Sequence, residues 1–119
     1  MVVRPLRTVS LWGPDGRRIY ETEVSPPSSG EPNTHRFWDG ISSATADNDG
    51  TVAVAVDFSI WQNRAPGGHS APWDGKITGH FGGIALLDSA GTQTGFLETG
   101  RYLPQGMCFA KDHSIWTIE

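Results

Sequence analysis

Short segments in which apolar and polar residues alternate recur along the chain, and one pair of them repeats at a fixed offset. The matching pairs are residues 9–12 with 17–22 and residues 84–87 with 92–97. Each pair is joined by a turn that ends in glycine, Gly16 in the first and Gly91 in the second, 75 positions apart. Glycine adopts a left-handed backbone at little cost, and short turns of this kind connect antiparallel strands. The pattern predicts two similar β-hairpins.

A second kind of hairpin is predicted twice. Its segments are residues 40–44 with 51–56 and residues 106–110 with 114–118. The glycines Gly40 and Gly106 lie 66 positions apart, whereas Thr51 and Ser114 lie 63 apart. We therefore expect the earlier turn to be three residues longer than the later one, in which His113 stands where the earlier copy has a glycine. The sequence TVAVAV at 51–56 is the clearest strand, because β-branched residues favour extended backbone.

The order of these hairpins predicts the architecture. If A to D denote the four strands of one repeat, the chain reads C-D, A-B-C-D, A-B. This order is typical of antiparallel four-stranded β-propeller blades, here about two blades in permuted order and all-β. Within a single segment 1–119, we expect an outer hairpin at 5–24, a complete blade at 40–100 and an inner hairpin at 104–119. The alternative is a β-sandwich whose hairpins resemble one another only because such proteins reuse the same turns.

Residues 104–118, PQGMCFAKDHSIWTI, carry a resemblance to a known group of proteins. They resemble the inner hairpin of six- or seven-bladed propellers of the NHL and sugar-lactonase-like kind. Blades of that kind often carry Pro-x-Gly-hydrophobic followed by Asp-Gly-hydrophobic-Trp/Tyr. The resemblance extends over the rest of the chain only as a strand pattern, and it implies a fold rather than an activity. The metal-binding Glu, Asn and Asp of those families have no matching motif here, so no catalytic residue is transferred.

Two segments, 25–39 and 57–82, are longer than the repeat needs and contain many Pro, Ser and Gly residues, which predicts loops. In a propeller, D-to-A and B-to-C connections emerge on the same face, so we expect these two loops to form one binding face. Aromatic rings beside carboxylates and arginine are typical of sugar, peptide or small-molecule recognition. The candidate binding residues are His35, Arg36, Trp38, Asp39, Trp61, Arg64, His69, Trp73, Asp74 and His80.

These residues also have a purely structural interpretation. The Trp-Asp-Gly sequences that begin at Trp38 and Trp73 can pack the ring on a blade while the aspartate caps a turn. The spacing of the three loop histidines matches no standard metal site. Residues 47–50, Asp-Asn-Asp-Gly, begin like a calcium loop, but its closing glutamate is missing. We therefore predict no metal site, no cofactor and no catalytic residue. His80, which precedes Phe81, Gly82 and Gly83, is the histidine that we consider a candidate to face the central channel.

Composition narrows the class of partner. A net charge of −4 disfavours nucleic acid and anionic lipid, and no apolar run is long enough to span a membrane. Fifteen glycines and eight prolines suit a turn-rich all-β protein. The single cysteine, Cys108, excludes an intramolecular disulfide and is expected to be a buried thiol. No apolar core of a signal peptide follows Met1.

Taken with the loops, the sequence predicts a binding or scaffold module for a small molecule, a carbohydrate or a protein. The alternative is part of a lactonase-like hydrolase or lyase with its site on the central channel. Two blades cannot close a ring, and open sheet edges promote aggregation. We therefore expect either a head-to-tail homo-oligomer, with three copies completing six blades, or a fragment that needs the remaining blades of a longer chain.

Overall fold

The computed structural model describes residues 7–25, 27, 34–63 and 75–119, except for the side chains of Phe37, Trp38 and Asn63. All regular elements of this part are strands, so the all-β class is confirmed. The strands are β1 (Thr8–Trp12), β2 (Arg18–Glu23), β3 (Thr34–Ala46), β4 (Val52–Asn63), β5 (Gly75–Leu87), β6 (Gln93–Gly100), β7 (Gly106–Phe109) and β8 (Ile115–Ile118). None of the described residues forms a helix long and apolar enough to cross a membrane.

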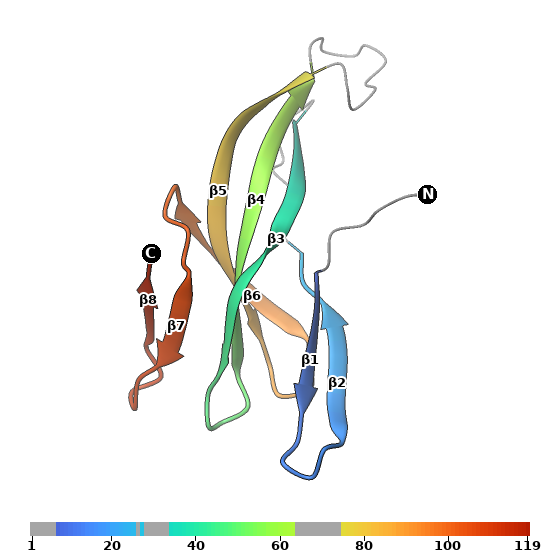
Figure 1. The fold of residues 1–119 in the computed structure, drawn as a ribbon, viewed down its shortest axis with the longest axis vertical. Coiled ribbons are helices and arrows are strands. Elements are labelled where there is room, and N and C mark those ends of the chain that lie inside the picture. Colours follow the sequence, from blue (N-terminus) through green and yellow to red (C-terminus); the bar gives the residue numbers. More distant parts are fainter. Residues whose placement is uncertain (1–6, 26, 28–33, 64–74) are drawn as a thin grey trace.

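The strands form three antiparallel sheets. β1 pairs with β2, β3 to β6 form a four-stranded meander in sequence order, and β7 pairs with β8. The hairpins predicted from the alternating segments are therefore confirmed, and the division into three sheets differs from that of a two-sheet sandwich. Figure 1 shows the three sheets as layers, with the curled four-stranded sheet in the middle and one hairpin on each side.

The four tight turns share one geometry. In each, the first residue donates its amide to the carbonyl four positions on and accepts from the amide three positions on, as Asp88 does with Thr92 and Gly91. The fourth position has positive φ in every turn: Gly16, Gly50, Gly91 and His113. All four turns lie at the lower end of the molecule in Figure 1. His113 does occupy the glycine position, as the sequence predicts, and it is the only described non-glycine residue with positive φ.

The expected difference in turn length is wrong. The pairs Ala46–Val52 and Phe109–Ile115 close the two turns at the same place, and both strands of one hairpin match the other at an offset of 63. The match between Gly40 and Gly106 is not structural, because β3 continues to Ala46 and contains register shifts that its copy lacks. The length difference lies in the strand rather than in the turn.

The core lies between the first hairpin and the middle sheet. Side chains alternate along β4, so Val52, Val54, Val56 and Phe58 share one surface, which we call the valine face. Val24 packs on this face together with Leu87 of β5, and both are fully buried. Each such side chain contributes about 2 kcal/mol to stability. The side-chain amide of Gln93 also exchanges two hydrogen bonds with the backbone of Ser25 (3.0 and 2.8 Å), which fixes the chain just after β2 beside β6.

The opposite surface of the middle sheet, the alanine face, carries Ala53, Ala55, Asp57 and Ser59 of β4. Its lower part is covered by the last hairpin and the chain leading into it. β7 lies against β3, and the Ser42 hydroxyl donates to the carbonyl of Pro104 at 2.6 Å. The backbone there comes so close that a Cβ on Gly82 would lie 2.4 Å from the carbonyl oxygen of Tyr102.

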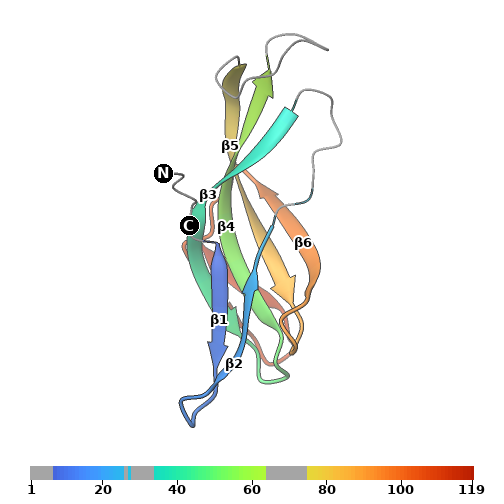
Figure 2. The same ribbon diagram turned by 90° about the vertical axis from the view of Figure 1, so that its right-hand side faces the viewer.

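Within the two segments predicted as loops, most of the residues that the structure describes belong to strands, which corrects that expectation for this part. Residues 34–39 begin β3, residues 57–63 end β4, and residues 75–82 begin β5. The middle sheet therefore extends well beyond both hairpins, at the top of Figures 1 and 2. The repeat needs no residues there, and for that reason the sequence suggested loops. Residues 64–74 lie outside the part that the structure describes.

Cys108 is exposed, contrary to the sequence-based expectation of a buried thiol. Its neighbours Met107 and Phe109 are partly buried, and Cys108 alternates with them. It lies opposite Trp116 of β8, which is also exposed. A four-residue strand in a two-stranded hairpin can cover only one of its two faces, and Cys108 belongs to the other.

Candidate functional site

The extended half of the middle sheet carries a cluster of polar side chains on its alanine face. One member of the cluster, Asp39, lies at a β-bulge in β3. Trp38 lies opposite Phe58 and Gly40 lies opposite Asp57, so Asp39 has no partner in the register. Bulges of this kind redirect a side chain and are common beside functional sites. Here the bulge brings the Asp39 carboxylate onto the same face as Ser59.

Ser59 links two of the predicted residues. Its hydroxyl donates to Oδ2 of Asp39 at 2.6 Å and lies 2.9 Å from Nδ1 of His80, which is directly opposite Ser59 on β5. Nδ1 of His80 also lies 3.5 Å from the same Asp39 oxygen. A serine hydroxyl has one hydrogen, so His80 must donate the second bond through Nδ1. In the neutral ring this arrangement leaves Nε2 as the acceptor.

Asp57 adds a second carboxylate to this face. It precedes Ser59 by two residues on β4, and its Oδ1 is buried without a hydrogen-bond partner among the described residues. Burial raises the pKa of Asp57 above its usual value, and the negative charge of Asp39 raises it further. Asp57 therefore binds a proton, or accepts a hydrogen bond from a ligand, more readily than an ordinary surface aspartate.

We call these four residues, Asp39, Asp57, Ser59 and His80, the Asp–His cluster. The side chains of His80 and Asp39 are 66% and 42% exposed, whereas Ser59 is only 3% exposed. The cluster is thus open to solvent above an anchored hydroxyl. Such an arrangement can hold hydroxyl or amine donors on the carboxylates and a further donor on the imidazole.

Two more predicted residues share this face. His35 and Trp61 are directly opposite each other on β3 and β4, farther toward the end of the sheet. His35 is exposed and Trp61 is half-buried. The structure thus brings His35, Asp39, Trp61 and His80 to one surface. Asp57 and Ser59 were not predicted, because residues 57–61 were expected to lie in a loop. Their alternation, Asp-Phe-Ser-Ile-Trp, is the signal that places both side chains on one face of a strand.

Arg36 lies on the opposite surface, the valine face. Its guanidinium forms an ion pair with Glu98 at 2.5 Å and lies 5.2 Å from the centre of the Phe58 ring. Only 14% of the side chain is exposed. A cavity of about 80 Å³ lies beside it, lined also by Ile60 and Phe81. Buried charge in such a pairing anchors β3 to β6, so Arg36 has a structural role here that is separate from the Asp–His cluster.

The remaining candidates fall outside the described part of the chain. These are the side chain of Trp38 and the residues Arg64, His69, Trp73 and Asp74. Their predicted place in a binding face stays a prediction.

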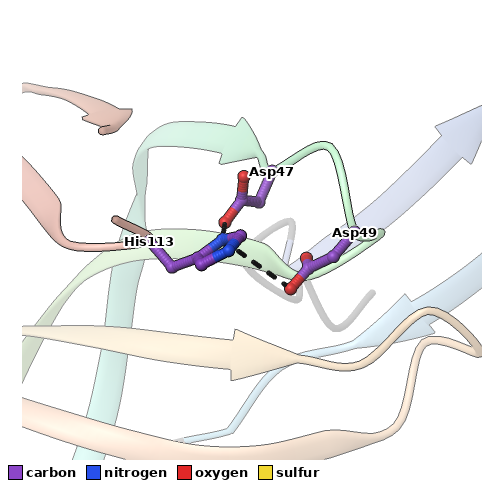
Figure 3. A group of neighbouring side chains, drawn as sticks. All are labelled: Asp47, Asp49 and His113. Carbon is purple, nitrogen blue, oxygen red and sulfur yellow. Dashed lines mark hydrogen bonds and ion pairs between the residues drawn. The ribbon is translucent and has the colours of Figure 1, made fainter. Parts of the chain in front are cut away.

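A second group of titratable side chains lies at the tight-turn end. His113 Nδ1 is 2.6 Å from Oδ2 of Asp47 and 3.9 Å from Oδ2 of Asp49 (Figure 3). The hydrogen bond and negative charge of Asp47 raise the pKa of His113. Asp49 also accepts the Thr51 amide at 2.9 Å, and this bond lowers the pKa of Asp49. Three possible ligand atoms lie within 4.8 Å of one another, but their visible role is to tie two turns together.

No protein-family model matches the sequence, and no curated protein or solved structure matches it either.

Proposed function

We propose that the chain is about two blades of a β-propeller, with β1–β2 and β7–β8 as half-blades on either side of a complete blade. The stacking order supports this proposal. In the A-to-D lettering of the repeat, β7 is the A strand of the last hairpin, and it lies against β3, the A strand of the middle sheet. At the other end, the segment after the D strand β2 bonds to the D strand β6 through Gln93. Blades packed face to face in a ring place like strands against like strands.

The function proposed for this module is binding of a small polar ligand, with a carbohydrate as the first class to test. The observation that carries the proposal is the exposed pair of Asp39 and His80, held in place by a buried serine. Ordered carboxylates accept hydrogen bonds from the hydroxyls of a sugar. The half-buried indole of Trp61 on the same face offers an apolar surface of the kind that sugar rings stack on.

The alternative is a hydrolase or lyase of the lactonase-like propeller kind. An enzyme that used Ser59 as nucleophile would need its hydroxyl to reach the substrate, with the histidine accepting its proton. Ser59 is buried, and its hydroxyl donates its hydrogen to Asp39 rather than to His80. The cluster therefore supports binding better than nucleophilic catalysis.

The test is a glycan array followed by calorimetry with any ligand that binds. We expect Asp39→Asn and His80→Ala to weaken binding at least tenfold, which corresponds to about 1.4 kcal/mol. Asp15→Asn, in the exposed β1–β2 turn, is the matched control and is expected to leave binding unchanged. Binding that survives both cluster substitutions, or no binding to any carbohydrate, would contradict the proposal.

A further inference from the structure

Large apolar side chains are exposed on the two outer layers of the molecule. Trp116 and Ile118 of β8 are 67% and 71% exposed, and Trp12 of β1 is 57% exposed. Each belongs to the surface of a hairpin that points away from the middle sheet, as the alternating exposure of β1 and β8 shows. In the middle sheet, Leu97 of β6 is 49% exposed, and it lies opposite Ile84 on the alanine face.

The hairpins correspond to parts of the middle sheet residue by residue. β1–β2 and β5–β6 have the same register, including a shift between Leu11 and Trp12 that matches the shift between Leu86 and Leu87. β7–β8 and the turn half of β3–β4 also share their register. Trp12 therefore corresponds to a position on the valine face, and Trp116, which corresponds to Ala53, to a position on the alanine face.

Both layer contacts inside the chain are of one type: an alanine-type surface packs on a valine-type surface. Val9 and Tyr20, on the alanine-type surface of the first hairpin, pack against the valine face of the middle sheet. The alanine face of that sheet in turn packs against the last hairpin. The two surfaces left open are a valine-type surface on β1–β2 and an alanine-type surface on β7–β8. One open surface is of the alanine type and the other of the valine type, so they could pack on each other as the layers within the chain do.

Two strand edges are complementary as well. In the described part of the chain, β8 pairs only with β7, and β1 pairs only with β2. By the register, β8 corresponds to β4 and β1 to β5, and these two strands pair with each other in the middle sheet. An exposed edge strand is a template for pairing with another chain.

We propose that the exposed surfaces and edges bind a second copy of this chain, head to tail, so that β7–β8 of one copy and β1–β2 of the next form one four-stranded blade. Transferring the β4–β5 register gives the contact. Thr117 would lie opposite Ser10 of the partner copy, and Trp116 opposite the partner copy's Leu11. Trp116 and Ile118 then cover the valine face of the partner copy's β3–β4. The partner copy's Trp12 covers Leu97.

The inference rests on the blade stacking proposed above and is independent of the ligand. Each copy supplies one complete blade and two half-blades, so three copies give six blades, within the range of about four to eight that closes a propeller. A repeated head-to-tail contact forms a closed ring only when its rotation closes. The expected assembly is a discrete trimer.

Native mass, measured by light scattering on a size-exclusion column, tests the assembly. We expect three times the 12.9 kDa mass of one chain. Trp116→Ser removes an apolar contact between copies without changing the core of one copy. The variant should have the mass of a monomer by light scattering and remain folded by circular dichroism. Ile77→Ser is the control, since Ile77 is 50% exposed but lies in residues 75–82, the part of β5 that extends beyond the hairpins. A wild-type monomer, or a trimer that Trp116→Ser leaves intact, would overturn the proposal.

Disulfide trapping tests the register. In a Cys108→Ser background, Ser10→Cys with Thr117→Cys should form a bond between chains, because directly opposite residues have Cβ atoms about 5 Å apart. Thr8→Cys with Thr117→Cys is the control, two residues out of register and about 7–8 Å apart. Equal cross-linking of both pairs, or of neither, would contradict the composite blade. Either result leaves the ligand proposal unaffected, since no residue of the Asp–His cluster is changed.

Discussion

At the scale of single residues, His113 combines an unfavourable backbone with a favourable charge. Its φ of 68° costs energy for any residue with a Cβ, whereas Asp47 raises its pKa above 6.5. Stability from this pairing is fully present below pH 6.5 and is lost as the pH rises through the raised pKa. We expect His113→Gly to melt lower than wild type below pH 6.5, and at the same or a higher temperature above the raised pKa. The shift is on the order of a few degrees.

Calorimetry across this pH range measures the crossover, and His113→Asn serves as control because asparagine tolerates the left-handed backbone but carries no charge. A pH-independent difference between wild type and both variants would mean that the ion pair contributes nothing. The backbone role of His113 was predictable from its match to Gly50. Its partner was not, because Asp47 is 66 residues away and meets it only through the stacking of the sheets.

Asp57 provides a second prediction at this scale, in which the substitution is expected to stabilise the protein at neutral pH. Burial and the charge of Asp39 raise its pKa above 3.8, so protonation of Asp57 stabilises the folded state. That stability is present below pH 3.8 and is lost as the pH rises through the raised pKa. Asp57→Asn should therefore stabilise the protein at neutral pH and leave its stability unchanged in acid. Denaturant unfolding at both pH values measures this; an equal effect at the two would refute the assignment.

At the scale of elements, the tight turns and hairpins were predictable because they depend on local chemistry: glycine at the left-handed position and alternation beside it. The extended halves of β3, β4 and β5 were not. Both 34–39 and 75–82 follow a proline closely and lack sustained alternation of apolar and polar residues, and 75–82 contains three glycines. They are strands because they pair with 57–63, a long-range contact that composition does not reveal. The Asp–His cluster was only half predicted for the same reason.

The close contact between the middle sheet and the chain leading into the last hairpin depends on Gly82. A Cβ there would lie 2.4 Å from a backbone oxygen of Tyr102 and 2.7 Å from the Thr99 hydroxyl, and backbone cannot move aside cheaply. We expect Gly82→Ala to destabilise the protein by about 1–3 kcal/mol. Gly95→Ala, whose Cβ would meet Leu86 at an ordinary 3.7 Å, should be neutral or slightly stabilising. Denaturant midpoints compare the two; equal effects would mean that the layers do not pack this closely.

At the scale of the whole molecule, the order of the strands followed from the repeat, but the layering did not. Only the structure reveals which surface of each hairpin is buried, since that depends on contacts such as Val24 with the valine face and Ser42 with Pro104. The exposed surface of each hairpin is then the informative one. On β8, Trp116 and Ile118 are both about two-thirds exposed or more, and they form the apolar surface that the proposed assembly would cover.

Assembly through these surfaces has a thermodynamic consequence that is independent of mass measurements. If folding of the two half-blades is completed by neighbouring copies, unfolding also dissociates them, and the melting temperature must rise with protein concentration. We expect this rise for wild type and for Ile77→Ser, and its loss in Trp116→Ser, which exposes no core residue in the single copy. Calorimetric scans over a hundredfold dilution measure it, since mass action makes the effect logarithmic in concentration. A melting temperature that stays constant on dilution, with Trp116 intact, would show that each copy folds and remains alone.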